Sequence, residues 1–165
     1  MEKEYTAYYG SPLGPIRLRA NEACITELHF MDKDELASAP DAVMPPVLQQ
    51  CLEELIAYFQ GTLKNFNVPV QQEGTVFQQR VWSELLNIPF GKTISYLTLA
   101  KRLGDPKAIR AAAATNGKNN IAIIVPCHRV IGTNNDLVGY AGGLWRKKWL
   151  LDLETKITWG VQTLF

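Results

Sequence analysis

Long apolar runs and cysteines are both scarce in this sequence. None of its 165 residues falls in the roughly 18 uninterrupted apolar residues that a membrane helix needs. The charged start Met1–Glu4 is not followed by the apolar core of an export signal. We therefore expect a soluble globular protein without a membrane partner, in the cytoplasm or, for a eukaryotic source, the nucleus. Hydrophobic residues make up 47% of the chain and charged residues 20%, which suffices for the core of one domain or two small ones.

Cysteine usage argues against both a disulfide framework and a metal centre. Cys24, Cys51 and Cys127 are odd in number and widely spaced, which predicts free thiols in a reducing compartment. Cys24 and His29 could supply two metal ligands, but a tetrahedral site needs four, and only Cys51 and His128 remain as nitrogen or sulfur donors. We expect no metal and no cofactor, although a metal role for Cys24 and His29 stays open.

The net charge of the whole chain is only +1, but acidic and basic residues are concentrated in different halves of the sequence. Residues 1–74 carry 5 Lys/Arg against 11 Asp/Glu, a net of −6, whereas residues 75–165 carry 12 against 5, a net of +7. A basic half is an electrostatic footprint for a polyanion such as DNA. The alternative is that each half merely has a solvated charged face.

The amino-terminal part reads as a small α+β domain over residues 1–72. Ile16, Leu18 and Ala20 alternate with polar residues between two turns, and residues 24–31 predict the next strand. Apolar residues then recur at helical spacing over 48–59 before Gly61, which makes Cys51 a core residue. No chemistry is visible in this domain.

A second, mainly helical domain is expected over residues 73–165. One apolar stripe predicts a first helix that ends at Pro89, and Ser95 caps a second helix that stops at Gly104. Asp105 and Pro106 open a third helix that runs to Gly117. The stripe consists of Phe77, Val81, Leu85 and Ile88.

The second and third helices have the spacing of a helix-turn-helix unit. The third helix is rich in alanine, which by default marks tight packing. Alternatively its bare face lets the backbone approach a DNA groove while basic side chains meet phosphates. On that interpretation the DNA-binding residues include Lys107, Arg110, Ala111 and Ala112.

The segment around Cys127 contains the candidate site. The apolar run Ile121–Val125 predicts a buried strand or extended segment, and it leads into Pro126-Cys127-His128-Arg129. An adjacent imidazole and guanidinium favour the thiolate, which is the nucleophilic form of cysteine. The bland alternative is a buried thiol, a core histidine and a surface arginine.

The string Val125-Pro126-Cys127-His128-Arg129-Val130-Ile131 resembles the active-site signature of the O6-alkylguanine-DNA alkyltransferases, also called methylated-DNA–protein-cysteine methyltransferases. The resemblance covers nearly all of residues 75–156, and the Ser11–Gly14 turn is similar to the family's amino-terminal domain. It implies an α+β fold in which a small ribonuclease H-like domain precedes a mainly helical domain with a helix-turn-helix. Other matching segments are 77–86, 90–96, 107–111, Asn119, 139–144 and 148–154.

The resemblance implies a reaction in which Cys127 removes the alkyl group from O6-alkylguanine, and possibly from O4-alkylthymine, and keeps it. His128 is then the base that takes the Cys127 proton through a bridging water, and Glu154 orients His128. Asn119 braces the cysteine segment, because its amide can bond backbone on both sides. Glu154 is expected in the last turn of a helix over 144–154, where the helix dipole disfavours a carboxylate. Considered apart from the family resemblance, Glu154 is expected to be a solvent-exposed glutamate.

The base pocket follows from the same resemblance. Tyr96 donates a hydrogen bond to the extruded purine and crowds the neighbouring phosphate, with Ser95 beside it on the DNA. Tyr140 forms a wall of the pocket, and the carbonyls of Cys127 and Val130 read the exocyclic amine. Read alone, both tyrosines are core aromatics with polar tips.

Arg110 matches the family's finger residue, which enters the base stack when the nucleotide is flipped out. The partner is therefore double-stranded DNA with alkylated guanine, bound by a monomer. The chain departs from many relatives at Ala141, where serine is frequent, and at Asn120, where proline is frequent. Ala141 lies in the predicted base pocket, so the preferred alkyl group and its size are left undetermined.

Three other functions would each explain part of the sequence. A noncatalytic lesion sensor is disfavoured by the presence of Cys127. A Cys-His hydrolase needs an oxyanion hole, which nothing in the sequence marks. A helix-turn-helix regulator explains the basic half but not the Pro126–Arg129 motif.

Overall fold

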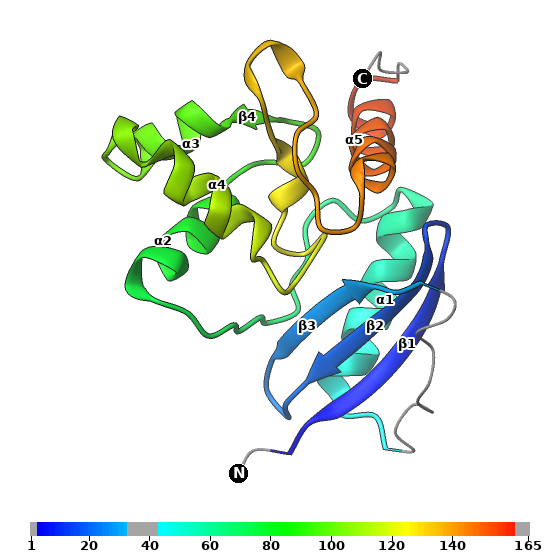
Figure 1. The fold of residues 1–165 in the computed structure, drawn as a ribbon. Coiled ribbons are helices and arrows are strands. Elements are labelled where there is room, and N and C mark those ends of the chain that lie inside the picture. The colour runs from blue at the N-terminus through cyan, green and yellow to red at the C-terminus, as the bar shows by residue number, and fades with distance from the viewer. Residues whose placement is uncertain (1–2, 33–42, 161–165) are drawn as a thin grey trace. The chain divides into compact units, whose positions relative to one another are not determined.

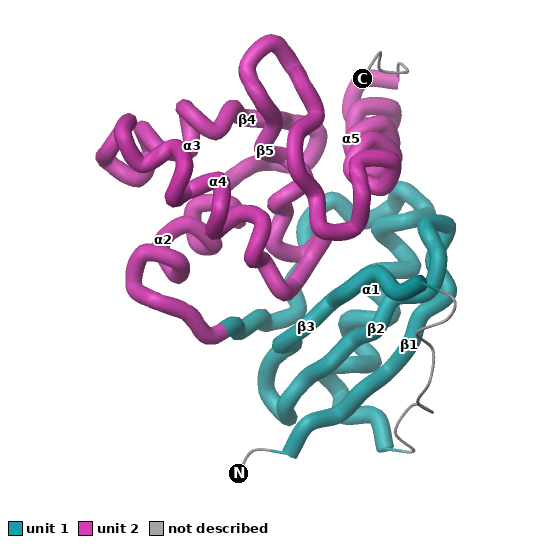
Figure 2. The backbone as a smooth tube through the Cα atoms, viewed as in Figure 1, with its two compact units in different colours: residues 1–72 teal, residues 73–165 magenta. Residues whose placement is uncertain are grey.

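The computed structural model describes residues 3–32 and 43–160; Met1 and Glu2 of the charged start lie outside this part. The chain divides into two compact units, residues 1–72 (unit 1) and residues 73–165 (unit 2), which Figure 2 shows in different colours. No described helix is both long and apolar enough to cross a bilayer.

Unit 1 is an antiparallel three-stranded sheet with one helix across a face (Figure 1). The strands follow one another in the order β1-β2-β3, and the helix α1 contacts all three. The predicted turn between the first two strands is present, with the Ser11 hydroxyl donating to the Gly14 carbonyl at 2.6 Å. The elements are β1 (Tyr5–Ser11), β2 (Gly14–Ala20), β3 (Ile25–Phe30) and α1 (Pro46–Gln60).

The core of unit 1 lies between the sheet and α1. Leu18 pairs with Ala7 on one side and Leu28 on the other, and all three are buried. From the helix, Leu48, Cys51 and Leu55 are completely buried, which confirms the predicted apolar stripe and the core position of Cys51. Ile56 also falls in the apolar stripe that the sequence predicts over 48–59, but its side chain is 41% exposed, and Tyr58 is buried instead.

Unit 2 is mainly helical, and its helices α2, α3 and α4 contact one another (Figure 1). Val81, Leu85 and Ile88 are buried as predicted, although α2 ends before Ile88. The elements are α2 (Val76–Leu85), β4 (Ile94–Ser95), α3 (Tyr96–Arg102), η2 (Pro106–Ala108), α4 (Ile109–Gly117), η3 (Cys127–Arg129), β5 (Val130–Ile131), η4 (Thr133–Asn135) and α5 (Leu144–Trp159).

The helix-turn-helix forms as the sequence predicts. The Ser95 hydroxyl accepts from the Thr98 N–H at 3.0 Å and so caps α3, which ends just before Gly104. Gly104 has φ +91°, a conformation that favours glycine. The Asp105 side chain caps the next element, which begins as the short 3₁₀ turn η2 before α4.

The predicted strand over Ile121–Val125 is wrong, because this segment folds as a compact buried turn. Ile123 adopts φ 69°, which breaks an extended path. The Asn119 side chain stabilises the turn by donating to the carbonyls of Ile121 at 3.2 Å and Val125 at 2.8 Å, and by accepting from the Ile121 N–H. The apolar composition of the segment predicts its burial correctly, but it does not predict its backbone conformation.

A short parallel pairing joins two distant parts of unit 2. β4 pairs with β5, with Ile94 opposite Val130 and Ser95 opposite Ile131. β4 directly precedes α3, and β5 directly follows the turn that carries Cys127. The start of the helix-turn-helix is therefore held beside the cysteine segment.

Candidate active site

Cys127 begins the 3₁₀ turn η3 and is only 7% exposed. Burial raises the pKa of its thiol, while a hydrogen bond from Asn119 and the positive charge of Lys147 oppose that rise. The expectation that its surroundings favour the thiolate is therefore wrong for the resting protein. Cys127 rests as a thiol and needs a base to become a nucleophile.

A buried ionic cluster follows Cys127 directly. The Glu154 carboxylate accepts from His128 Nε2 at 2.7 Å and, in a bidentate pair, from Arg129 Nε at 2.8 Å and Nη2 at 3.1 Å. All three side chains are buried. Burial alone raises the pKa of Glu154, but His128 and Arg129 outweigh it and hold that pKa well below its usual range. Glu154 is a carboxylate at any physiological pH.

The cluster determines which nitrogen of His128 can accept a proton. Burial lowers the pKa of His128, and Glu154 only partly offsets the effect, so the imidazole is neutral. Because a carboxylate only accepts hydrogen bonds, the hydrogen must sit on Nε2. Nδ1 then carries the free lone pair, and it has no hydrogen-bond partner among the described residues. His128 is thus set up as a base at Nδ1.

Glu154 lies in the interior of α5, not in its last turn. The helix runs on to Trp159, so the macrodipole argument for an unusual carboxylate is wrong, as is the reading of a solvent-exposed glutamate. Glu154 shares the buried face of α5 with Leu150 and Leu151. Its Oε1 also accepts from the Gly91 N–H at 3.2 Å.

Lys147 is a completely buried cation on the same helix face, one heptad before Glu154. Its ammonium donates to the carbonyls of Val130 at 2.7 Å, Val138 at 2.8 Å and Gly139 at 3.2 Å. Burial lowers its pKa to about 8, so it remains charged at neutral pH. Lys147 ties the loop after β5 to the cysteine segment and places a positive charge near Cys127.

The predicted base-pocket residues gather around this loop. The Tyr96 hydroxyl donates to the Val138 carbonyl at 3.2 Å, so its hydrogen is engaged in the absence of DNA. Burial raises the pKa of Tyr140 well above its usual value, and the Cys127 thiolate, once formed, raises it further. Val130 is fully buried, and Ala141 is exposed.

The predicted DNA-binding residues divide by exposure. Lys107, Arg110 and Ala111 are exposed on η2 and α4, where they are free to meet a ligand. The expectation is wrong for Ala112, which is completely buried because it faces the helices that pack against α4. Ser95 is half-buried and caps α3.

Both units match known protein families. Residues 76–156 match the family described as "6-O-methylguanine DNA methyltransferase, DNA binding domain", and residues 5–72 match "6-O-methylguanine DNA methyltransferase, ribonuclease-like domain". The chain belongs to the 6-O-methylguanine DNA methyltransferase family. The α+β fold with a ribonuclease-like first unit is confirmed.

Curated and solved relatives of this methyltransferase family cover almost the whole chain. The methylated-DNA–protein-cysteine methyltransferase of Methanosarcina acetivorans is 45% identical over 152 residues, which are 91% of this chain and 97% of the relative. The crystal structure of the Mycobacterium tuberculosis O6-methylguanine methyltransferase is 42% identical, with a TM-score of 0.81 over 93% of this chain and 94% of that one. The M. tuberculosis OGT structure in complex with DNA is 44% identical, with a TM-score of 0.82 over 91% and 92%.

The sequence alone does not predict the buried positions of two charged residues in this methyltransferase site. The sequence predicts that Arg129 is a surface charge or a support for the thiolate, yet it is buried against Glu154 and donates to the Ile88 carbonyl at 2.8 Å. The sequence does not distinguish Lys147 from its neighbours, because it stands in the basic run Arg146–Lys148. A usable signal was present, since Lys147 and Glu154 flank Leu150 and Leu151 at the spacing of one helix face.

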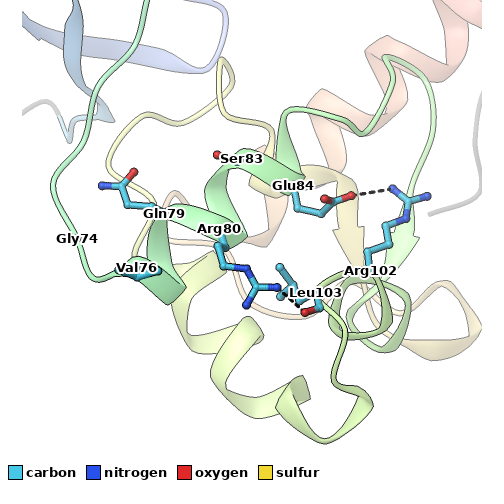
Figure 3. Close-up of a pocket in the computed structure, with 8 residues that line it drawn as sticks. All are labelled: Gly74, Val76, Gln79, Arg80, Ser83, Glu84, Arg102 and Leu103. Carbon is cyan, nitrogen blue, oxygen red and sulfur yellow. Dashed lines mark hydrogen bonds and ion pairs between the residues drawn. The ribbon is translucent and has the colours of Figure 1, made fainter.

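A separate hollow of about 460 Å³ lies on unit 2 between α2 and the end of α3 (Figure 3). Arg80 donates to the Leu103 carbonyl there at 2.6 Å, and Arg102 pairs with Glu84 at 3.9 Å. None of its lining residues belongs to the Cys127 site. Within the described ranges, no group of three or more His, Cys, Asp or Glu side chains could hold a metal ion.

Proposed function

We propose that this chain repairs O6-alkylguanine in double-stranded DNA by moving the alkyl group irreversibly onto the sulfur of Cys127. One observation carries the proposal: a buried thiol is followed by a neutral histidine whose Nε2–H is bound by the buried carboxylate of Glu154. The names of the curated relatives and the DNA complex of the M. tuberculosis protein support the substrate class.

The reaction requires a proton to leave the thiol before the alkyl carbon is attacked. His128 Nδ1 takes the Cys127 proton through a bridging water, and Glu154 stabilises the imidazolium that results. The thiolate sulfur then forms a bond to the alkyl carbon as the bond from carbon to O6 breaks. The electron pair goes to the purine, which takes up one proton to balance the one that Cys127 lost to His128, so ordinary guanine remains in the DNA.

The pocket residues contribute by orienting the base and the segment that carries the thiol. Asn119 holds the turn before Cys127, and Lys147 holds the loop behind it. Tyr96 exchanges its bond to Val138 for one to the purine, where a donor stabilises the developing charge on the leaving group. Tyr140 forms a wall of the pocket, and the Cys127 carbonyl accepts from the exocyclic amine.

The lesion must leave the base stack to reach a buried thiol. We assign the finger that fills the gap to Arg110, on the exposed face of α4, with Lys107, Ala111 and the Ser95–Tyr96 segment along the backbone. The segregated positive charge of residues 75–165 is consistent with this surface. We expect a monomer acting on DNA in the cytoplasm.

The stoichiometry of alkyl uptake tests the proposal. Incubation with excess O6-methylguanine duplex should add one methyl group to the peptide that contains Cys127, and product should plateau at one equivalent, because a thioether has no easy route back to a thiolate. Mass spectrometry of the intact protein and its peptides gives both numbers. Linear turnover beyond one equivalent, or a methyl group on Cys24 or Cys51, would contradict it.

A further inference from the structure

Asn116 is a buried polar side chain near the end of α4, only 4% exposed. Its Nδ2 donates to the main-chain carbonyl of Cys127 at 3.3 Å. It is thus bonded to the residue proposed to receive the alkyl group.

The direction of the Asn116 amide follows from that bond. A carbonyl oxygen can only accept, so the atom of Asn116 that faces Cys127 is the nitrogen, and the oxygen is the other branch of the planar amide. That oxygen, Oδ1, is buried and has no hydrogen-bond partner among the described residues. A buried acceptor without a donor costs free energy comparable with a lost hydrogen bond, and native proteins rarely leave one without a reason.

The surroundings of Asn116 point to the base pocket. Burial raises the pKa of the Tyr96 hydroxyl, and a hydrogen bond from Asn116 opposes that rise, so Asn116 reaches both Tyr96 and Cys127. Under the proposed function, both of these residues contact the extruded base. Asn116 therefore lies among the groups that receive the purine.

Only one group on the lesion's Watson–Crick edge can satisfy a bare acceptor. Alkylation at O6 removes the hydrogen from N1, so the exocyclic amine is the remaining donor on that edge. Both carbonyls that the resemblance assigns to this amine already accept one hydrogen bond, Val130's from Lys147 at 2.7 Å and Cys127's from Asn116 at 3.3 Å. A further acceptor is thus chemically useful in this pocket.

We propose that Asn116 determines specificity for guanine, with Oδ1 accepting one N–H of the exocyclic amine while Nδ2 holds the Cys127 carbonyl to accept the other. The inference rests on the proposed function, because it assigns a reader to the base that Cys127 repairs. Asn116 makes the pocket distinguish guanine lesions from purine lesions that lack the amine.

The test pairs two duplexes that differ only in the amine, one with O6-methylguanine and one with O6-methylhypoxanthine. Single-turnover rates are measured for wild type, Asn116→Leu, which is similar in shape but apolar, and Thr115→Val as a matched control. Thr115 is an equally buried polar neighbour on α4. The readout is each protein's ratio of rates on the two duplexes.

Wild type should prefer the guanine lesion, and Asn116→Leu should reduce that preference about tenfold, since one hydrogen bond of about 1.4 kcal/mol is a factor of ten. Thr115→Val should keep the wild-type ratio. If Asn116→Leu does not fold, Asn116→Ala is used in its place. An unchanged ratio, even with both rates reduced, would overturn the inference and make Asn116 a support for the Cys127 segment. Absence of alkyl uptake by wild type from either duplex would overturn the proposed function, and the inference with it.

Discussion

Each unit of the molecule buries one cysteine, and the two thiols have opposite surroundings. Cys51 in unit 1 is completely buried in the core, and burial raises its pKa to about 12, with the negative charge of Glu54 adding to the rise. Cys127 in unit 2 is almost as buried, but Asn119 and Lys147 oppose the rise in its pKa.

Burial without opposing groups strongly disfavours the thiolate, which is the nucleophilic form of cysteine. Under the proposed function, the reactivity of Cys127 depends on its neighbour His128 and on two groups brought to it from α5, the cation Lys147 and the carboxylate Glu154 that binds His128. Cys51 is an internal control for the same chemical group without these neighbours.

The sharpest test of the comparison exchanges each thiol for alanine. Cys127→Ala should abolish alkyl uptake, whereas Cys51→Ala should still take up one equivalent at the wild-type rate. Cys51→Ala should instead lose about 1 kcal/mol of unfolding free energy, the typical cost of a destabilising point substitution. Intact mass after incubation with O6-methylguanine duplex and denaturant unfolding measure the two effects. Slow alkylation in Cys51→Ala would break the comparison.

The next largest effect is expected from removing the charge that orients His128. Glu154→Gln should slow alkyl transfer about 100-fold, the scale of lost general-base catalysis. Because Glu154 raises the pKa of His128, the variant's His128 should protonate at lower pH, so the acid limb of the rate profile should move downward. Single-turnover rates across pH, at temperatures where both proteins are folded, show both effects.

Asp152→Asn is the matched control for Glu154→Gln, since Asp152 is a partly exposed carboxylate on the same helix, paired with Lys148. It should leave the rate and the pH profile unchanged. An unshifted acid limb in Glu154→Gln would remove His128 as the base.

A third test contrasts arginines of the two units. Arg110→Ala in unit 2 should slow repair in matched duplex about tenfold, because the gap left by a flipped nucleotide is no longer filled. Reaction with free O6-alkylguanine base should be nearly unaffected, and repair in a mismatch should suffer less. Arg19→Ala, which removes an arginine paired with Glu27 in unit 1, should change none of these single-turnover rates. Equal losses on matched and mismatched duplexes would remove Arg110 from the finger role.

The smallest expected effect concerns the cation near Cys127. Lys147→Met should slow transfer several-fold at pH 7, because the charge that favours the thiolate is lost. In the folded protein Lys147 has a pKa of about 8 against an ordinary 10.5, so between these values the unfolded chain binds more protons. Wild type should therefore gain stability over the variant as pH rises through that window, measured by denaturant unfolding. No relative gain would mean that Lys147 keeps an ordinary pKa.

Much of the architecture was predictable from local pattern. Alternation over Ile16–Ala20, the cap at Ser95 and the stop at Gly104 all appear in the structure as expected. These features depend on residues within a few positions of one another. The motif around Cys127 also identified the candidate site, because it is contiguous in the sequence.

The predictions that were wrong concern features that depend on contacts between distant residues. The apolar run Ile121–Val125 became a turn because Asn119 bonds both of its ends and Ile123 takes a positive φ. Ala112 is buried by helices packed against α4, which no local pattern reports.

The sequence by itself determined which residues could be a nucleophile, a base and a DNA-facing helix, because residue type and short-range spacing decide those capacities. Only the tertiary structure decided which of these residues are charged and which are neutral. Glu154 is charged because the Arg129 guanidinium and the His128 imidazole meet it across 25 and 26 residues of chain. Lys147 is held in the interior by carbonyls of β5 and of the loop that precedes its own helix. A pKa depends on every charge and dipole within several ångströms, and only folding brings those groups together.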